Sequence, residues 1–473
     1  MVKFFYKLAL FFILSISITN IFCLTNQVDK NLSLSNKKVK NLYFNYPNYP
    51  FYSLPYFKDT FFNIEFSSSW ANKGFTSSGG CHNLSTVIFK NQNILLKDIF
   101  ETSNLLYGGY LNAIGTTGPY SAPFLYKNLY SYVLAEKFLK FNASTAKNYL
   151  NFSMQHYFSR PSISFGVAMP VVHRKNKIKM ESKLSIAERQ ALYTNTPAFF
   201  QKYEDLEDFF EKILTAKNIG YNRCDSELGF GDVTFFASTK IKNKNFESII
   251  TGLRVVLPTG YYKDRTDKLW NPDFGNGGFY ELGYFFALHK KYDKIINPYC
   301  FVDFSFSLPS KVYRRIPKYL TYDGVNPRPD TPVKSNLLLG GDTVYYKAYN
   351  TLDTTIAAFA DDSVRVKAYK GLQVLLRLGN TIDEVLFKDG FLDFYYEFST
   401  RAGENIIKSS VDTAKYEINL FKKDRFELEH KLAINYSYLF KKFQRFTLGF
   451  NCIIYGKNVP KTFEAKVGFS KDF

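Results

Sequence analysis

The chain ends with the segment Thr462-Phe-Glu-Ala-Lys-Val-Gly-Phe-Ser-Lys-Asp-Phe473, in which apolar and polar residues alternate. The apolar side chains share one parity of the sequence: Phe463, Ala465, Val467, Phe469 and Phe473. A period of two predicts a strand with one apolar and one polar face. Because no element follows it in the sequence, this strand has to find its partner elsewhere, as the closing strand of a barrel does. An edge strand of a soluble sandwich is the alternative.

The terminal aromatic residues resemble the C-terminal signal of bacterial outer-membrane β-barrel proteins, which the barrel-assembly machinery reads on the last strand. Phe469 and Phe473 carry the resemblance, and Lys471 departs from it by standing on the apolar parity. A lysine near a strand end can extend its amine into the headgroup region. The resemblance implies the outer membrane of a diderm bacterium, with its lipid and the assembly machinery as partners.

The composition favours one large barrel over several soluble domains. The 473 residues are 18% aromatic and 46% hydrophobic, with a mean hydropathy of −0.21. This combination suits alternating strands with aromatic girdles. The net charge of +19 comes from scattered lysines. We expect no nucleic-acid partner, because no long Lys/Arg run or zinc-ligand spacing accompanies this charge.

The N-terminal segment 1–23 reads as a secretory signal peptide, with two lysines before the apolar stretch Leu8–Phe22. Cys23 as a lipoprotein cysteine is rejected because the bulky Phe22 precedes it. No apolar run of about 18 residues follows, so no transmembrane helix is expected. Residues 24–57 are interpreted as an N-terminal extension or lumen insert, and residues 58–473 as the barrel.

Alternation predicts an all-β fold, a transmembrane antiparallel barrel of about 12 strands with helical insertions in loops or lumen. The predicted strands are 61–70, 162–171, 226–241, 246–258, 278–290, 297–308, 364–378, 391–400, 414–421, 425–440, 446–455 and 462–473. Large insertions fall near 72–156, 175–225 and 309–363. If every long insertion lies on the outer side of the membrane, this set of strands places the C-terminus on the outer side too. Barrel proteins keep both ends in the periplasm. One strand is therefore missed or split, and 309–363 and 400–414 are the suspected places.

Three segments have helical spacing. Leu95–Leu106 and Leu129–Leu150 are expected as helices that plug the barrel or lie beneath it. Residues 197–214 form an amphipathic pattern with an apolar stripe and an acidic face. That helix either packs against a neighbouring loop or restricts passage through the barrel mouth.

Two glycine-containing motifs resemble a known family. The segment Glu227-Leu-Gly-Phe-Gly-Asp-Val-Thr-Phe is followed, after a turn, by Leu253-Arg-Val-Val-Leu-Pro-Thr-Gly260. They resemble the outer-membrane barrels described as phenol-degradation meta-pathway proteins, relatives of the FadL-like transporters. The matching positions are Gly229, Gly231, Asp232, Pro258, Thr259 and Gly260. The resemblance implies a membrane channel or transporter and supplies no nucleophile or ligand set.

No catalytic, cofactor-binding or metal-binding residues are assigned, and the chain is not expected to be an enzyme. His173 follows a strand that contains Ser162 and Ser164, but no Gly-x-Ser-x-Gly elbow of a serine hydrolase accompanies them. The sequence also has no His-Glu-x-x-His motif of a zinc protease. Cys81 and Cys224 border loops and could pair.

The sequence thus predicts an outer-membrane channel or transporter for small solutes, with hydrophobic solutes as one option. The alternative is a structural or adhesive surface barrel with a blocked lumen. The solute, the pore radius and the oligomeric state are left open by the sequence.

Overall fold

The computed structural model describes much of the chain. The described residues are 43–46, 49–53, 60–89, 93–95, 138–158, 163–182, 185–187, 207–208, 211, 214–215, 219–221, 223–241, 246, 248–260, 274–290, 296–316, 333–335, 344–346, 362–387, 389–412, 426–441 and 444–472.

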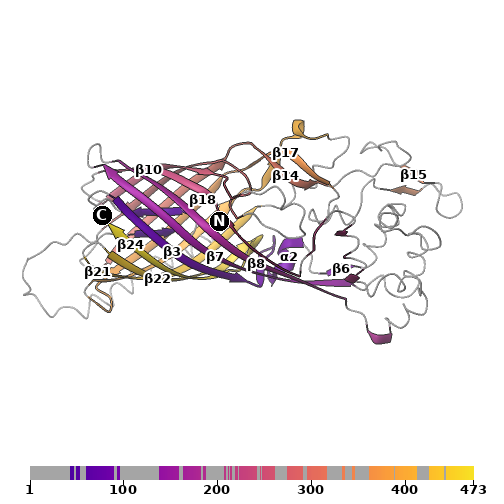
Figure 1. Cartoon of the computed structure of the whole chain (residues 1–473), viewed down its shortest axis with the longest axis horizontal. Coiled ribbons are helices and arrows are strands. Elements are labelled where there is room, and N and C mark those ends of the chain that lie inside the picture. Colours follow the sequence, from indigo (N-terminus) through magenta and orange to yellow (C-terminus); the bar gives the residue numbers. More distant parts are fainter. Residues whose placement is uncertain are drawn as a thin grey trace, which may run out of the picture. The chain divides into compact units, whose positions relative to one another are not determined.

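Twelve strands form a closed antiparallel barrel, seen as the tilted ribbons of Figure 1. In chain order they are β3 (Thr60–Ala71), β7 (Phe138–Phe158), β8 (Ile163–Ser182), β10 (Val233–Ile241), β11 (Ser248–Leu257), β12 (Glu281–His289), β13 (Ile296–Ser307), β18 (Gln373–Asp383), β19 (Gly390–Arg401), β21 (Glu427–Lys441), β22 (Gln444–Lys457) and β24 (Phe463–Asp472). Each strand pairs with the next, and β24 pairs with β3 to close the ring. The predicted fold class and strand count are therefore confirmed.

The strand faces separate by polarity, as alternation predicts. Large apolar side chains are exposed on the outer face, among them Phe66, Phe235, Tyr284, Phe304, Ile434, Phe450 and Val467. Polar side chains on the opposite parity are buried inside, among them Glu65, Ser153, Arg254, Asp303, Arg377, Glu397 and Lys466. In a bilayer the outer face meets lipid and the closed ring leaves no unpaired strand edge.

The strand that the sequence interpretation missed is β7, which lies in neither of the suspected places, 309–363 and 400–414. Residues 129–150 were expected to be helical, but β7 begins at Phe138 and runs to Phe158. The ring closes with β7 and without the predicted strand 414–421, so β3 starts and β24 ends at the same end of the barrel, where Phe61 pairs with Asp472. We call this the turn end, because the short connections lie there, and the opposite end the loop end. Residues 414–421 lie outside the described part of the chain.

The loop end carries most of the smaller elements. β7 and β8 continue beyond the ring as a long hairpin, to which β9 (Cys224–Phe230) adds along β8 and β6 (Asn93–Leu95) along β7. A three-stranded sheet consists of β14 (Ser310–Ile316), β17 (Asp362–Lys370) and β20 (Glu404–Ile406), followed by the 3-10 turn η3 (Lys408–Ser410). A second consists of β23 (Val459–Pro460), β4 (Lys73–Phe75) and β5 (Cys81–Asn83), next to helix α2 (Leu84–Phe89).

Two further hairpins are described by themselves: β1 (Tyr43–Tyr46) with β2 (Tyr49–Ser53), and β15 (Val333–Ser335) with β16 (Val344–Tyr346). None of the helices in the described residues has the length and apolar character to cross a membrane. Of the acidic segment 197–214, only residues 207–208, 211 and 214 are described, all helical, with Leu214 buried. The rest of that segment, and residues 96–106, lie outside the described part.

The pairing of Cys81 with Cys224, which the sequence left open, does not occur: both thiols are free and exposed. Cys300 and Cys452 are also free.

Candidate functional site: the barrel lumen

One side of the barrel interior carries an apolar cluster. It joins inward side chains of neighbouring strands from β10 to β21: Phe236, Ile250, Phe285, Ala287, Tyr299, Phe301, Leu375, Tyr395 and Ala433. Phe285 and Phe301 stack with ring centroids 6.1 Å apart. Because both lie on the inward parity of adjacent strands, this part of the lumen wall is aromatic.

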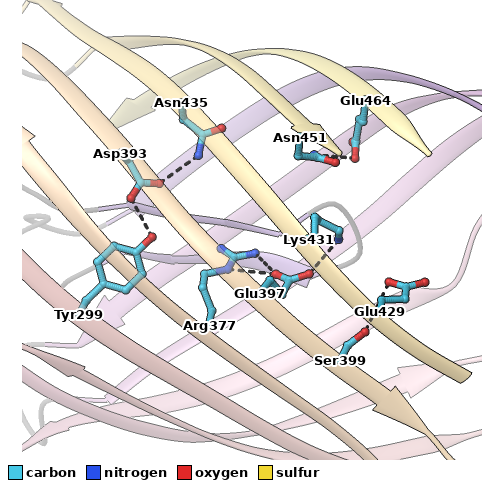
Figure 2. A network of polar contacts seen from close by, with 10 residues as sticks. All are labelled: Tyr299, Arg377, Asp393, Glu397, Ser399, Glu429, Lys431, Asn435, Asn451 and Glu464. Carbon is cyan, nitrogen blue, oxygen red and sulfur yellow. Dashed lines mark hydrogen bonds and ion pairs between the residues drawn. The ribbon is translucent and has the colours of Figure 1, made fainter. Parts of the chain in front are cut away.

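Ion pairs run along the wall beside this cluster. Arg254 of β11 contacts Asp303 Oδ2 through Nε at 2.8 Å and Glu281 Oε1 through Nη2 at 2.6 Å. Glu397 of β19 accepts from Arg377 at 2.6 Å on one oxygen and from Lys431 at 2.8 Å on the other (Figure 2). Each charge of these two groups thus has an opposite charge within hydrogen-bonding distance, which offsets the cost of removing it from water.

Large inward side chains lie flat over glycines of the neighbouring strand. Phe285 covers Gly252, to which it is paired across β11 and β12. A Cβ on Gly252 would lie 2.2 Å from the Phe285 ring. Arg254 covers Gly283 in the same way on its path from β11 to Asp303 of β13. The glycines therefore let long side chains follow the wall instead of projecting into the lumen.

Several inward polar atoms on the opposite wall have no hydrogen-bond partner among the described residues. They come from the neighbouring strands β7, β3, β24, β22 and β21: Asn151 Nδ2, Ser153 Oγ, Asn63 Nδ2, Glu65 Oε2, Ser67 Oγ, Glu464 Oε1, Lys466 Nζ, Asn451 Oδ1 and Asn435 Oδ1. Buried polar groups are normally satisfied by protein or by ordered water. The lumen thus has an aromatic wall and a wall with free donors and acceptors.

A cavity of about 370 Å³ lies inside the barrel, lined by strands around most of the ring. Its polar lining includes Glu65, Lys147, Tyr149, Asn151, Ser153, Thr234, Arg254, Glu281, Glu397, Ser399, Arg401, Glu427, Glu429 and Lys431. The inward orientation of Glu427, Glu429 and Lys431 is the one that alternation along β21 predicts. The loop residues Phe274, Gly275 and Asn276 complete the lining.

The two family-like motifs meet at the edge of this cavity. Asp232 accepts hydrogen bonds from the backbone N–H of Gly260 at 2.9 Å and of Asn276 at 2.5 Å. Thr259 Oγ1 donates to the Gly231 carbonyl at 2.7 Å and accepts from the Val233 N–H at 3.0 Å. A carboxylate that accepts two backbone N–H groups is a strong anchor. The motifs therefore fix the loop 274–276 to the wall.

Close packing explains the glycines of these motifs. A Cβ on Gly260 would lie 2.9 Å from the Gly275 nitrogen, and one on Gly229 would lie 2.3 Å from the Phe274 ring. A Cβ on Gly231 would lie 2.5 Å from Pro170 Cγ of β8. Pro258 directly follows β11, where no ladder hydrogen bond is needed.

Arg174 holds the other side of the same loop. Its guanidinium lies 4.8 Å from the centroid of the Phe274 ring and contacts Glu227 at 2.9 Å. Because Arg174 is only 1% exposed, this cation–π contact is shielded from water. The loop 274–276 is thus held by Asp232 on one side and Arg174 on the other.

Phe469 lies on the outer face of β24, paired with Phe446 and Ile64. Phe473 lies outside the described residues. His430 also faces outward, within an aromatic group that includes Tyr396, Phe398 and Tyr455. Within the described residues, no group of His, Cys, Asp and Glu could hold a metal ion.

The sequence interpretation did not single out the Arg377–Glu397–Lys431 and Arg254–Glu281–Asp303 groups. The available signal was a charged residue on the polar parity of an otherwise apolar strand, as Arg377 is between Leu376 and Leu378.

Comparisons with known proteins gave structural likenesses only. No family model matches the chain, and no curated protein sequence matches it. The crystal structure of the COG4313 outer membrane channel from Pseudomonas putida F1 is 9% identical, with a TM-score of 0.44 over 89% of this chain and 97% of that one. The CymD monoaromatic hydrocarbon channel is 8% identical, with a TM-score of 0.31 over 88% and 89%. The KdgM porin is 9% identical, with a TM-score of 0.26 over 71% and 99%. The fold assignment rests on the strand pairing of the chain itself.

Proposed function

We propose that this protein is an outer-membrane channel of a diderm bacterium that passes small solutes. One observation carries the proposal: a closed barrel with an apolar outer face encloses a cavity whose lining is polar and charged. A barrel that only anchors loops has no need for unpartnered donors and acceptors on its inner wall. The lining favours solutes with polar groups over pure hydrocarbons, and the aromatic wall offers contacts for an apolar part.

A surface barrel with a blocked lumen is the second candidate. Its support is the complete burial of several inward side chains, since Arg377 and Phe285 are 0% exposed and Tyr395 is 2% exposed. In this alternative the side chains fill the ring, and function resides in the loop-end elements.

Conductance in planar bilayers separates these candidates. The refolded barrel, verified by heat-modifiable migration on a detergent gel, is expected to conduct. Tyr395→Ala removes a ring from the lumen wall and is expected to raise the single-channel conductance. The control Tyr284→Ala removes an outward ring, 47% exposed, and is expected to leave conductance unchanged. A folded barrel that does not conduct, before or after the Tyr395 change, would favour the blocked barrel.

Membrane location has a separate test. Deletion of Phe473 is expected to leave unfolded protein in the periplasm, because the proposed assembly signal is lost. Asp472→Asn serves as the control at the neighbouring position. Heat-modifiable barrel in the membrane fraction of the deletion strain would contradict the role of Phe473.

A further inference from the structure

We infer that the lumen cavity is a binding site for small organic cations, such as a primary ammonium ion carried on a short apolar chain. The inference deepens the proposed channel function and rests on it. Four features of the cavity lead to it: the negative sign of its charge, an unpartnered carboxylate oxygen, aromatic rings in the lining, and the contrast between its charge and the net positive charge of the chain.

The cavity has more carboxylates than cations. Its described lining holds six carboxylates, Glu65, Asp232, Glu281, Glu397, Glu427 and Glu429, and four cations, Lys147, Arg254, Arg401 and Lys431. The charged groups directly behind the lining are Arg377, next to Glu397; Asp303, next to Arg254; Lys466 and Glu464, which act on Glu65; and the pair Arg174–Glu227, next to Phe274. These three cations and three anions cancel, so the negative excess of the lining remains. The whole chain carries +19 at neutral pH, so the cavity has the opposite sign to the protein.

Glu65 supplies an acceptor that is not used. Its residue is 1% exposed, and its Oε2 has no hydrogen-bond partner in the described structure. Ser153 Oγ, on the neighbouring strand β7, is also unpartnered and lines the same cavity. An ammonium group has only donors, so it needs acceptors such as a carboxylate and a hydroxyl oxygen. Leaving such buried groups unpaired is costly, whereas a bound cation would satisfy them.

Glu429 supplies a second carboxylate with weak compensation. It accepts only a long hydrogen bond of 3.4 Å from Ser399, while its neighbour Lys431 is bonded to Glu397 at 2.8 Å. Glu427 lies 3.9 Å from Arg401, with its side chain 46% exposed. Both carboxylates of β21 line the cavity, and these contacts leave room for a donor from a solute.

Rings and aliphatic groups make up the rest of the lining. Tyr149 and Phe274 line the cavity together with Val256 and Leu375. Phe274 already stacks against a cation, Arg174, on one side. Aromatic faces attract organic cations, and the aliphatic groups suit a short carbon chain. These features distinguish an organic ammonium ion from an inorganic cation that keeps its water shell.

The test uses two probes of equal size and opposite charge, butylammonium and butyrate. Binding to the folded barrel in detergent is measured by calorimetry, and ion preference by the reversal potential of the channel in a KCl gradient. We expect butylammonium to bind, butyrate not to bind, and potassium to be preferred over chloride. Glu65→Gln and Glu429→Gln are each expected to weaken butylammonium binding by about tenfold, the loss of one charged hydrogen bond.

Glu181→Gln is the matched control, because it removes a carboxylate of β8 that pairs with Lys179 outside the cavity lining. It is expected to leave binding unchanged. If Glu65→Gln does not give a heat-modifiable barrel, Glu427→Gln replaces it, since that side chain is partly exposed. Chloride preference, or equal binding of butyrate, would overturn the cation site and leave the channel intact. Butylammonium binding to a barrel that does not conduct would overturn the channel and leave the site intact.

Discussion

The hydroxyl of Tyr299 donates to the Asp393 carboxylate at 2.7 Å, although the two residues lie on strands β13 and β19, which are not neighbours (Figure 2). The strand between them is β18, and Tyr299 crosses it over Gly379. Asp393 also accepts from Asn435 of β21 at 2.9 Å. Two bonds thus connect β13, β19 and β21 across the lumen wall, and the bond from Tyr299 requires that Gly379 of β18, under the ring, has no side chain.

Gly379→Ala is expected to break this link. The added Cβ would lie 2.3 Å from Tyr299 Cζ, so the ring has to lift toward the lumen. We expect a destabilisation of roughly 1–3 kcal/mol, the range for overpacking, and a lower conductance. Gly468→Ala is the control, since its Cβ would meet nothing closer than 3.7 Å. Urea titration of the two variants in detergent gives the comparison, and equal losses would contradict the role of Gly379.

Asp232→Ala is expected to release the loop 274–276 from the wall. Two backbone N–H groups, of Gly260 and Asn276, lose their acceptor. The cavity should become larger, so conductance should rise while the midpoint of unfolding falls. Asp232→Asn keeps an oxygen acceptor at the position, so its conductance and its midpoint of unfolding should lie between those of the wild type and the alanine variant. An Asp232→Ala barrel with unchanged conductance and midpoint would show that the anchor has no influence on the cavity.

Phe450→Arg is expected to destabilise the barrel more than Asn451→Arg. Phe450 is 62% exposed on the outer face, and Arg at mid-depth of the bilayer costs ~2–4 kcal/mol. Asn451 faces inward and donates to Glu464 Oε2 at 2.8 Å, so an arginine there has a carboxylate partner. Folding titrations into lipid vesicles measure both changes. A smaller loss for Phe450→Arg would reverse the assignment of faces.

Lys370 should make the loop-end sheet sensitive to alkaline pH. Burial, with repulsion from Arg401 second, lowers the pKa of its amine from 10.5 to about 8. Its Nζ donates to the Asn276 carbonyl and lies 5.2 Å from the Phe279 ring centroid. Because the folded-state pKa is depressed, the unfolded state binds more protons between pH 8 and 10.5, so stability rises with pH in that window. Below pH 8 the Lys370 amine is protonated in both states, so the free-energy cost of burying its charge is fully present.

Thermal midpoints measured across this window provide the test. The wild type should gain stability from pH 8 toward 10.5, and Lys370→Met should reduce the slope. Lys367→Met is the control, since this exposed lysine lies on the same strand. If Lys367→Met reduces the slope of thermal midpoint against pH as much as Lys370→Met does, the effect belongs to net charge and not to Lys370.

The sequence predicted which side chains of a strand face inward and outward better than it predicted which segments form strands. Alternation is local, so Glu429 and Lys431 could be placed inward, and Ile434 outward, without any knowledge of the neighbouring strands. β7 was missed because the apolar residues of 129–150 have helical spacing, although Phe141 and Ala143 lie on one buried face of the strand and Ala143 packs with Leu84 of α2. Small and helix-favouring residues at 143–147 gave no clear alternation there. Tertiary contacts therefore decided the conformation of this segment.

The site itself depended on register. Arg377 and Glu397 are directly paired across β18 and β19, and Glu397 and Lys431 across β19 and β21, at separations that no local pattern encodes. The resemblance marked Gly231, Asp232, Thr259 and Gly260, and the structure joins them in the Asp232 anchor. The resemblance gave no indication of this contact or of its third partner, Asn276.

The seam between β3 and β24 has a consequence for the order of folding. Phe61 pairs with Asp472, so the ring closes only through contacts between residues at the two extremes of the barrel sequence. Pairings of this kind have high contact order and pay their loop-closure entropy before they contribute any stabilisation. The hairpin of β7 and β8, by contrast, pairs neighbouring segments of the sequence continuously, from Phe158 with Ile163 to Leu139 with Ser182. This topology favours a folding route in which the β7–β8 hairpin forms first and β3 pairs with β24 last.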